Sequence, residues 1–344
     1  GGISGIQASL ALASSGYRVY LVESSPTIGG KMAQLDKTFP TNDCSMCIES
    51  PKFIECDRHP NIEILTYTEV DSVEGQAGDF TVNLTKKARY IREDKCTGCT
   101  TCVEYCPVEV PDPFNQDLSG NKAIHIYFSQ AVPLVPYIDE RCLYLQDKKC
   151  SICVNVCQND AIDLNQKPEK IQLKVGAIVL SPGYGVYDPE PQGDYGYGKF
   201  ENVVTSLDFE RLLCATGPHE GEILRPSDKK HPHKVAWIHC VGSRQVTDED
   251  RSGEIDNRGL RKSYCSAVCC SYIQKQVILA KDHDADMQAT IFHNDIRSYG
   301  KDFERFYQRA EKLPGVEFVR SYVSVGREMP ETKNVTIRYS TTDE

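Results

Sequence analysis

The sequence contains no run of about 18 apolar residues, so it predicts no membrane-spanning helix. It also has no positively charged segment followed by an apolar stretch, and therefore no predicted signal peptide. Basic residues are in the minority, with 39 lysines and arginines against 49 acidic residues and a net charge of −10, which argues against nucleic acid as a partner. Because position 1 is not a methionine, we expect a fragment whose protein continues beyond both ends.

Cysteine, in contrast, is abundant. The chain has 16 cysteines among its 344 residues, and many of them stand in the short spacings that hold metals. Disulfide-rich scaffolds are usually short exported proteins, whereas this chain is long enough for two or three folding units. The cysteines therefore indicate a reducing cytoplasm and iron–sulfur ligation.

The first 34 residues follow the order of a dinucleotide-binding unit. Gly2 and Gly5 fit the last two glycines of G-x-G-x-x-G, a helical pattern follows, and a predicted strand ends at Glu23. A second glycine pair lets backbone approach a cofactor closely. It resembles two-dinucleotide-binding-domain flavoproteins, which favours FAD over NAD. The residues predicted to bind the cofactor are Gly2, Gly5, Glu23, Gly29, Gly30, Lys31, Met32 and Gly183.

Lys31 directly follows the second glycine pair. We predict that it lies near the isoalloxazine ring, where its positive charge would stabilise a reduced, anionic flavin. It is the one candidate for a catalytic residue, and the alternative is a solvated loop lysine.

The strongest local pattern is "CTGCTTCVEYCP", which has the C-x2-C-x2-C-x3-C-P spacing of bacterial ferredoxins with [4Fe–4S] clusters. A second set of four cysteines has the spacing C-x7-C-x2-C-x3-C, whose longer first loop is tolerable because loop closure costs grow slowly with length. In two-cluster ferredoxins the fourth cysteine of each motif ligates the other cluster. The predicted ligand sets are Cys96, Cys99, Cys102 and Cys157 for one cluster, and Cys106, Cys142, Cys150 and Cys153 for the other.

These patterns predict an α/β protein with an insertion. Residues 1–92 form the first part of an FAD-binding domain, and the cysteine-rich residues 93–166 form an inserted ferredoxin domain. Residues 167–184 return to the FAD-binding domain through a buried strand, "GAIVLSPGY". Residues 185–344 alternate strands and helices, as a second nucleotide-type domain with a parallel sheet does.

The late cysteines Cys240, Cys265, Cys269 and Cys270 form a further candidate site. Neighbouring Cα atoms lie about 3.8 Å apart, too close for a disulfide between Cys269 and Cys270, which usually needs at least about 4.4 Å. A helix over "YCSAVCCSYIQKQVILAKDH" would put Cys265 and Cys269 on one face. Cys240 follows a predicted strand at a turn without a G-x-G-x-x-G motif. Spacing alone leaves a cluster and buried thiols both open.

The motifs together resemble the family formed by the A subunits of heterodisulfide reductases. The matching segments include "GGKMAQLDKTFPTNDCSMC", "CTGCTTCVEYCPVEVP", "HCVGSR" and "YCSAVCC". The resemblance implies a thioredoxin-reductase-like flavoprotein with two dinucleotide-binding domains and an inserted two-[4Fe–4S] ferredoxin domain. It also implies FAD and a non-standard [4Fe–4S] cluster on the four late cysteines. Cys44 and Cys47 match a family motif, and we hypothesise that one of them helps to ligate a further cluster.

The implied function is electron bifurcation or confurcation between a two-electron donor, a disulfide-reducing partner and ferredoxin. The implied partners are heterodisulfide-reductase-type subunits, a hydrogenase or formate dehydrogenase module and ferredoxin, with homodimerisation inside a larger complex. One rival is a non-bifurcating electron-wiring protein, as in quinone-linked or benzoyl-CoA-reductase-linked complexes. The other is an NAD(P)H-dependent flavoprotein of the glutamate-synthase type, against which the missing second glycine motif argues.

The remaining candidates have ordinary explanations. Cys56 and Cys214 are expected to be buried thiols. No pairing of histidines predicts a ligand site, so a core or surface role is the default for His239, His293 and the other histidines.

Overall fold

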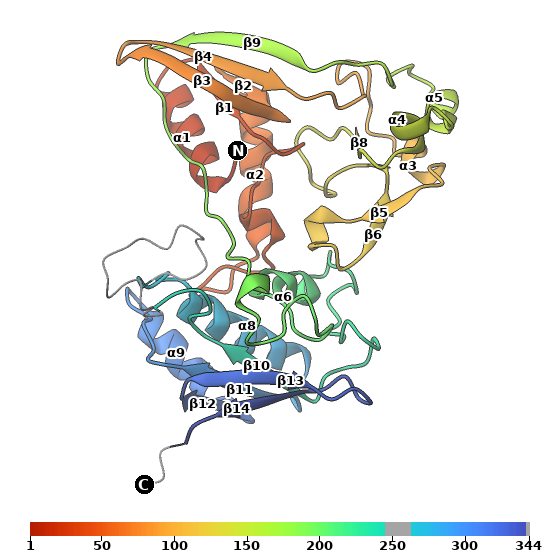
Figure 1. The fold of residues 1–344 in the computed structure, drawn as a ribbon. Coiled ribbons are helices and arrows are strands. Elements are labelled where there is room, and N and C mark those ends of the chain that lie inside the picture. The colour runs from red at the N-terminus through yellow and green to blue at the C-terminus, as the bar shows by residue number, and fades with distance from the viewer. Residues whose placement is uncertain (245–262, 342–344) are drawn as a thin grey trace. The chain divides into compact units, whose positions relative to one another are not determined.

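The computed structural model describes residues 1–244 and 263–341. The chain divides into two compact units, drawn in Figure 1, and each is described by itself. The first comprises residues 1–34 and 45–184, and the second comprises residues 35–44 and 185–344. The short segment 35–44 thus groups with the second unit, although it lies within the stretch predicted to form the first domain.

The first unit begins with a parallel strand pair and its helices. Ile6, Leu10 and Ala13 recur at helical spacing and are buried on α1 (Ile3–Ser14). The strand β1 (Val19–Val22) then pairs in parallel with β2 (Ile62–Leu65). The connection between these strands holds the 3-10 helix η1 (Met32–Gln34) and α2 (Ser45–Arg58). A parallel pair with a helical crossover is the unit that the opening motif predicted.

An antiparallel sheet of three strands, in the order β3-β4-β9, completes this part of the first unit. Its strands are β3 (Thr68–Gln76), β4 (Asp79–Lys86) and β9 (Glu169–Val175). Val82 and Leu84 of β4 point into a small core against alternate residues of β9, as expected for a sheet with one buried face. Residues 87–168 thus form an excursion between two neighbouring strands.

The prediction of a buried strand over "GAIVLSPGY" is wrong in this structure. The strand of this region is β9, and residues 177–184 are irregular. Val179 is 60% exposed and Leu180 is 84% exposed. Apolar composition predicted burial, but the described residues provide no neighbouring strand with which this segment pairs.

The excursion consists of short helices and two-residue or three-residue strands around a core of its own. Ile91, Ile124, Ile138 and Ile162 are buried in it, and six of the cysteines pack against this core or belong to it. So few regular hydrogen bonds suit a domain held by metal clusters. Its elements are α3 (Thr101–Glu104), β5 (Glu109–Pro111), η2 (Pro113–Asn115), β6 (Gly120–Lys122), β7 (Ile124–His125), β8 (Tyr137–Ile138), α4 (Leu143–Asp147) and α5 (Ile152–Val156).

The second unit contains a parallel sheet in the order β10-β11-β12 and an antiparallel hairpin of β13 and β14. The helix α8 connects β10 to β11, and α9 connects β11 to β12 (Figure 1). Its elements are η3 (Glu190–Gln192), α6 (Ser206–Leu213), β10 (Lys234–Ile238), α8 (Cys269–His283), β11 (Gln288–His293), α9 (Phe303–Glu311), β12 (Val316–Arg320), β13 (Val323–Glu328) and β14 (Val335–Tyr339). The alternation of strands and helices was predicted, and the result is a mixed α/β protein.

The helix predicted over residues 264–283 begins later than expected. It starts at Cys269, and Ala267 has a positive φ of 61°, which a right-handed helix excludes. Cys265 and Cys269 therefore do not share a helix face, and that step of the sequence argument was wrong.

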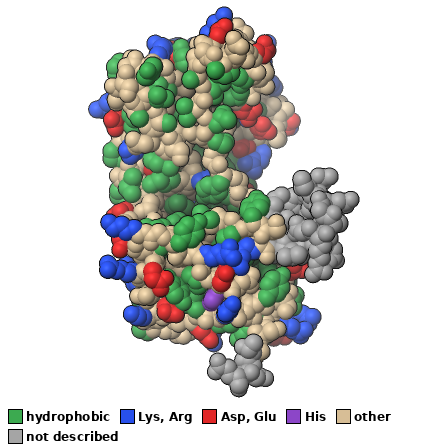
Figure 2. Space-filling model, turned by 90° about the vertical axis from the view of Figure 1, so that its left-hand side faces the viewer, with side chains coloured by type: hydrophobic (Ala, Val, Ile, Leu, Met, Phe, Trp, Pro, Cys, Tyr) green, Lys and Arg blue, Asp and Glu red, His purple; other side chains and the backbone are tan. Residues whose placement is uncertain are grey.

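Among the described residues, no helix is long and apolar enough to cross a membrane. On the face drawn in Figure 2, basic and acidic side chains are interspersed rather than gathered by sign.

Candidate functional site

Four of the predicted cluster ligands line one cavity of about 140 Å³ in the excursion. Cys102 lies on α3, and Cys157 directly follows α5. The cavity is lined by Cys96, Cys99, Cys102 and Cys157, together with neighbouring threonine, glutamine and asparagine side chains. The structure therefore brings together a set that combines three cysteines of the first motif with the last cysteine of the second.

Backbone amides already point at these sulfurs. The amide of Gly98 donates to the sulfur of Cys96 at 3.5 Å, and the amide of Ala161 donates to that of Cys157 at 3.4 Å. Burial, and then the thiols around it, raise the pKa of Cys102 to about 12. Several thiolates cannot coexist in so small a space without a compensating cation, and metal binding removes that conflict.

The other four cysteines of the excursion form a second group around Cys153. Burial raises the pKa of Cys153 to about 11, and the neighbouring thiols of Cys142, Cys150 and Cys106 raise it further. Cys153 also belongs to the surroundings that raise the pKa of Cys102. The two groups are thus neighbours, which is the arrangement that an electron path between two clusters requires.

The glycines of the opening motif meet in a narrow cradle. The amide of Gly29 donates to the carbonyl of Gly1 at 2.8 Å, and Gly2 forms a parallel bridge with Gly29. Gly2 is the N-cap of α1 and provides no side-chain hydrogen bond to the helix. The first amides of α1 are therefore left for another acceptor, as at helix ends that bind phosphate. A cradle of bare backbone at such a helix end fits a dinucleotide pyrophosphate.

Other predicted cofactor-binding residues lie around or away from this cradle. Glu23 follows β1, and its carboxylate accepts a hydrogen bond from the amide of Ser25 at 2.7 Å. Lys31 is half-buried beside Gly30, and burial lowers its pKa; Met32 begins η1. Gly183 lies in the irregular segment, where an added Cβ would meet nothing within 4 Å. The structure does not bring Gly183 to the other glycines.

Three of the late cysteines lie together at the carboxyl end of β10. Cys240 follows that strand, Cys269 and Cys270 open α8, and all three are buried in one cluster. Hydrogen bonds from Cys240 and Cys270 lower the pKa of Cys269, while the same contacts and burial raise the pKa of both donors. The three sulfurs thus share one small space.

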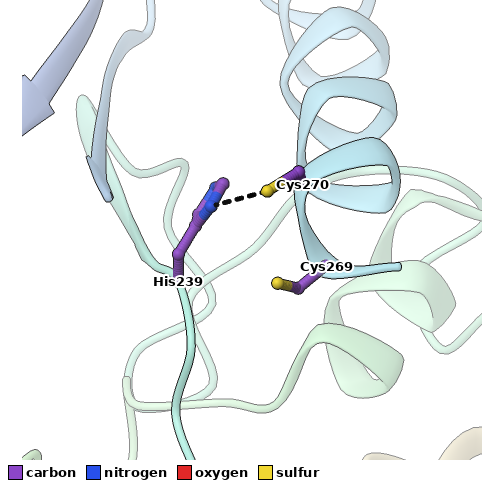
Figure 3. A group of neighbouring side chains, drawn as sticks. All are labelled: His239, Cys269 and Cys270. Carbon is purple, nitrogen blue, oxygen red and sulfur yellow. Dashed lines mark hydrogen bonds between the residues drawn. The ribbon is translucent and has the colours of Figure 1, made fainter. Parts of the chain in front are cut away.

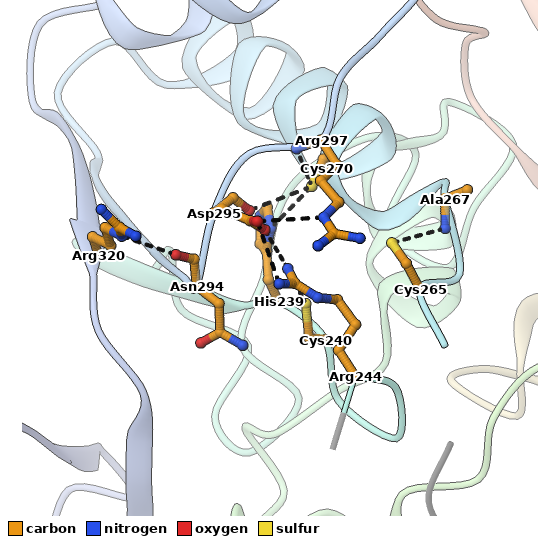
Figure 4. A network of polar contacts seen from close by, with 10 residues as sticks. All are labelled: His239, Cys240, Arg244, Cys265, Ala267, Cys270, Asn294, Asp295, Arg297 and Arg320. Atoms are coloured by element: carbon orange, nitrogen blue, oxygen red, sulfur yellow. Dashed lines mark hydrogen bonds and ion pairs between the residues drawn. The ribbon is translucent and has the colours of Figure 1, made fainter. Parts of the chain in front are cut away.

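Cys265 lies apart from this group. It is on the stretch before α8, and its sulfur accepts a hydrogen bond from the amide of Ala267 at 3.3 Å (Figure 4). The group of three buried sulfurs does not include it. The structure therefore assembles three of the four late cysteines predicted as ligands, and ligation by Cys265 stays a prediction.

The structure singles out His239, which no sequence pattern indicated as a ligand. Its Nδ1 lies 3.6 Å from the sulfur of Cys270, and the ligand atoms of His239, Cys269 and Cys270 all lie within 4.8 Å of one another (Figure 3). Burial lowers the pKa of His239 to about 4, so the ring is neutral at physiological pH. Its position next to Cys240 at a strand end was the only available signal.

A cavity of about 220 Å³ opens on the other side of His239. It lies at the carboxyl ends of β10, β11 and β12, where parallel sheets place their ligands. Its lining includes His239, Cys240, Ser243, Arg244 and His293. The cavity gives the surroundings of Cys240 a polar side.

The remaining cysteines differ in their surroundings. Cys44 and Cys47 are disulfide-bonded in the structure; their predicted part in a further cluster stays a prediction. Cys56 is fully buried and burial raises its pKa to about 11, as expected of a buried thiol. Cys214 is only partly buried, and its sulfur lies 3.3 Å from the hydroxyl of Thr216.

Grouped thiols in a mixed α/β chain define the class as an iron–sulfur protein. The family model described as "4Fe-4S binding domain" matches residues 89–112, which include all four cysteines of the first motif.

Named relatives identify the family. The chain is 47% identical over 321 residues to the A subunit of H(2):CoB-CoM heterodisulfide,ferredoxin reductase of Methanothermobacter marburgensis, covering 93% of this chain and 46% of that protein. It is 47% identical over 343 residues to the iron-sulfur A 1 subunit of CoB--CoM heterodisulfide reductase of Methanopyrus kandleri, covering 99% and 50%. The A subunit of the ferredoxin/F(420)H(2)-dependent CoB-CoM heterodisulfide reductase of Methanosarcina acetivorans is 40% identical over 326 residues, covering 94% and 39%. The chain belongs to the family of heterodisulfide reductase A subunits, and it spans about half the length of these relatives.

Proposed function

We propose that this chain is the FAD-binding and [4Fe–4S]-binding electron-transfer part of a heterodisulfide-reductase-like complex, an oxidoreductase of the cytoplasm. Its role is bifurcation or confurcation of electrons between a two-electron donor, a disulfide-reducing partner and ferredoxin. The observation that carries the proposal is the adjacency of the two cysteine groups, since Cys102 has members of both around it. Two adjacent clusters move electrons singly.

The flavin site is the second component. Bound FAD accepts two electrons together and releases them one at a time, which a pair of clusters alone cannot do. Gly2, Gly29 and Gly30 form the cradle for its pyrophosphate, and Glu23 stands after β1 where a ribose hydroxyl is bound in such units. Lys31 would stand beside the ring and offset negative charge on it. The names of the relatives support ferredoxin and a heterodisulfide as redox partners.

The proposed partners follow from the same relatives. The name of the M. marburgensis protein includes H(2), and that of a Methanococcus maripaludis relative, 43% identical over 341 residues, includes H(2)/formate. We therefore propose a hydrogenase or formate dehydrogenase module as donor, disulfide-reducing and cluster subunits as neighbours, and a homodimer inside the complex. The late cysteines would carry electrons singly towards one of these partners.

The test uses the assembled, anaerobically purified complex. Iron, sulfide and flavin are quantified first, and ferredoxin reduction is then followed with and without a disulfide acceptor. Bifurcation predicts that ferredoxin is reduced only while the disulfide is also reduced. Ferredoxin reduction that never depends on the second acceptor would identify a non-bifurcating wiring protein. Bleaching of the flavin by NADH without partner subunits would instead identify an NAD(P)H-dependent flavoprotein.

A further inference from the structure

His239 occupies a position between the late cysteines and the cavity beside them. Its side chain comes from the turn after β10 and points at the first turn of α8, where Cys270 stands (Figure 3). The residue is only 6% exposed. Such a burial of an imidazole costs free energy unless its nitrogen atoms are hydrogen-bonded, so its contacts identify what it does.

The two ring nitrogens have different surroundings. Nδ1 is 3.6 Å from the sulfur of Cys270, whereas Nε2 is buried without a hydrogen-bond partner among the described residues. The side chain lines the cavity of about 220 Å³. A neutral imidazole carries one N–H, and a thiolate is the stronger acceptor for it. The tautomer with the proton on Nδ1 therefore satisfies the contact that the structure provides.

We propose that His239 is a positioning residue that donates a hydrogen bond from Nδ1 to the sulfur of Cys270 and thereby raises the reduction potential of the cluster on the late cysteines. The inference rests on the proposed function, because it requires that cluster. Reduction adds one electron to the cluster and places additional negative charge on its sulfur atoms. A hydrogen bond stabilises the reduced state more than the oxidised state, and no proton moves.

His239 is one of several donors around these sulfurs. The amide of Arg297 donates to Cys270 at 3.3 Å, and the amide of Ala267 donates to Cys265 at 3.3 Å (Figure 4). The guanidinium of Arg244 lies 4.0 Å from the sulfur of Cys240 and is held by Asp295. Among the side-chain donors, His239 makes the shorter contact, so its removal should shift the potential without abolishing ligation.

The experiment compares His239→Leu and His239→Asn in the assembled complex. Leucine removes the donor, whereas an asparagine amide nitrogen can occupy the place of Nδ1. The matched control is His293→Leu, which removes another cavity-lining imidazole whose ring centre is 6.2 Å from that of His239. Potentiometric titrations followed by electron paramagnetic resonance report the cluster, and the signal lost in Cys270→Ser assigns it. We expect a more negative potential in His239→Leu and values near the wild type in the other two histidine variants.

A second measurement does not depend on the stability of any variant. Pulsed electron paramagnetic resonance of the reduced wild-type complex with ¹⁵N-labelled histidine should show a weak nitrogen coupling at this cluster. A strong coupling, typical of nitrogen bonded to iron, would make His239 a ligand and overturn the inference. Absence of coupling would overturn it too, as would an unchanged potential in His239→Leu. If the wild type has no signal that Cys270→Ser removes, the proposed cluster itself has failed.

Discussion

Gly2 and Gly30 pass each other at backbone contact. A Cβ atom on Gly30 would lie 2.9 Å from the Cα of Gly2, closer than real Cβ atoms approach other carbons. Gly30 also has a positive φ of 60°, which is costly for residues with a side chain. The closeness of these two segments builds the cradle proposed for the pyrophosphate of FAD.

Gly30→Ala should therefore release flavin. The added methyl group pushes the Gly29–Gly30 turn away from the N-terminus of α1, so we expect a large loss of bound FAD. The ratio of flavin to protein after anaerobic purification measures this. The matched control is Gly16→Ala, because Gly16 has a φ of 90° but an added Cβ there would meet nothing within 4 Å. Equal flavin loss in both variants would mean that backbone strain, and not the close approach, is responsible.

Lys31→Ala should shift the potential of the bound flavin to a more negative value. Burial lowers the pKa of Lys31, but the side chain stays a cation at neutral pH and would offset the negative charge of the reduced ring. A redox titration of the flavin absorbance is the measurement. Lys170→Ala is the control, because that lysine is 77% exposed on β9. An unchanged titration would identify Lys31 as an ordinary solvated loop lysine.

Cys157→Ser should remove the cluster that it shares with Cys96, Cys99 and Cys102. The four cysteines line one cavity, so we expect the iron content to fall by about four atoms per chain, the content of one [4Fe–4S] cluster. Iron analysis and the spectrum of the reduced protein are the measurements. Cys214→Ser is the matched control, because its sulfur contacts a threonine hydroxyl. Full iron content in Cys157→Ser would contradict the crossed assignment.

The sequence was informative where the chemistry is local. The ferredoxin spacing predicts which cysteines share a cluster because short loops limit which thiols can meet, and the structure gathers those same groups. The glycine motif likewise predicted a strand and helix from neighbouring residues. Distant contacts were less predictable. His239 reaches Cys270 across 31 positions of the sequence, and no local pattern encodes that approach.

The failed predictions have a common physical cause. Apolar residues 178–180 suggested a buried strand, but burial depends on a pairing partner elsewhere in the chain. The helix expected from Tyr264 begins at Cys269, because the turn at Ala267 brings Cys269 and Cys270 towards Cys240. Segment 35–44 groups with the second unit because Lys275 and Glu210 bind its backbone. Each outcome was decided by tertiary contacts.

The buried ion pair of Lys275 and Glu210 should be important for stability. Its atoms are 2.8 Å apart, and the two side chains are 1% and 2% exposed. Glu210→Ala would leave a buried ammonium without its carboxylate, for which we expect a loss of about 3–5 kcal/mol in the free energy of unfolding. Urea unfolding under anaerobic conditions measures it. Lys275 keeps one hydrogen bond to the carbonyl of Lys37, so the lower end of this range applies if that contact persists.

Two further variants identify burial as the cause. Glu210→Leu combined with Lys275→Met removes both charges and should recover much of the loss, because no unpaired charge is left inside. Asp71→Ala breaks the exposed pair with Lys170 and should cost less than about 1 kcal/mol. A double variant as unstable as Glu210→Ala would show that shape, and not charge, decides stability here.

Glu49 should make the first unit less stable as pH rises. The residue is fully buried on α2, neither of its carboxyl oxygens has a hydrogen-bond partner among the described residues, and burial raises its pKa to about 8. The unfolded chain has the ordinary pKa near 4.5. Between these values the folded state holds a proton that the unfolded state has lost, so stability falls across this window.

Glu49→Gln tests this sign directly. Glutamine is uncharged in both states, so the variant should lose the decline and exceed the wild type by up to a few kcal/mol, roughly 1.4 for each pH unit crossed. Anaerobic urea unfolding from about pH 6 to 8 measures both proteins in this window. Glu55→Gln, on an exposed position of the same helix, controls for the loss of one carboxyl group. If Glu49→Gln keeps the slope of the wild type, Glu49 is ionised in the folded protein, and a cation or donor must accompany it there.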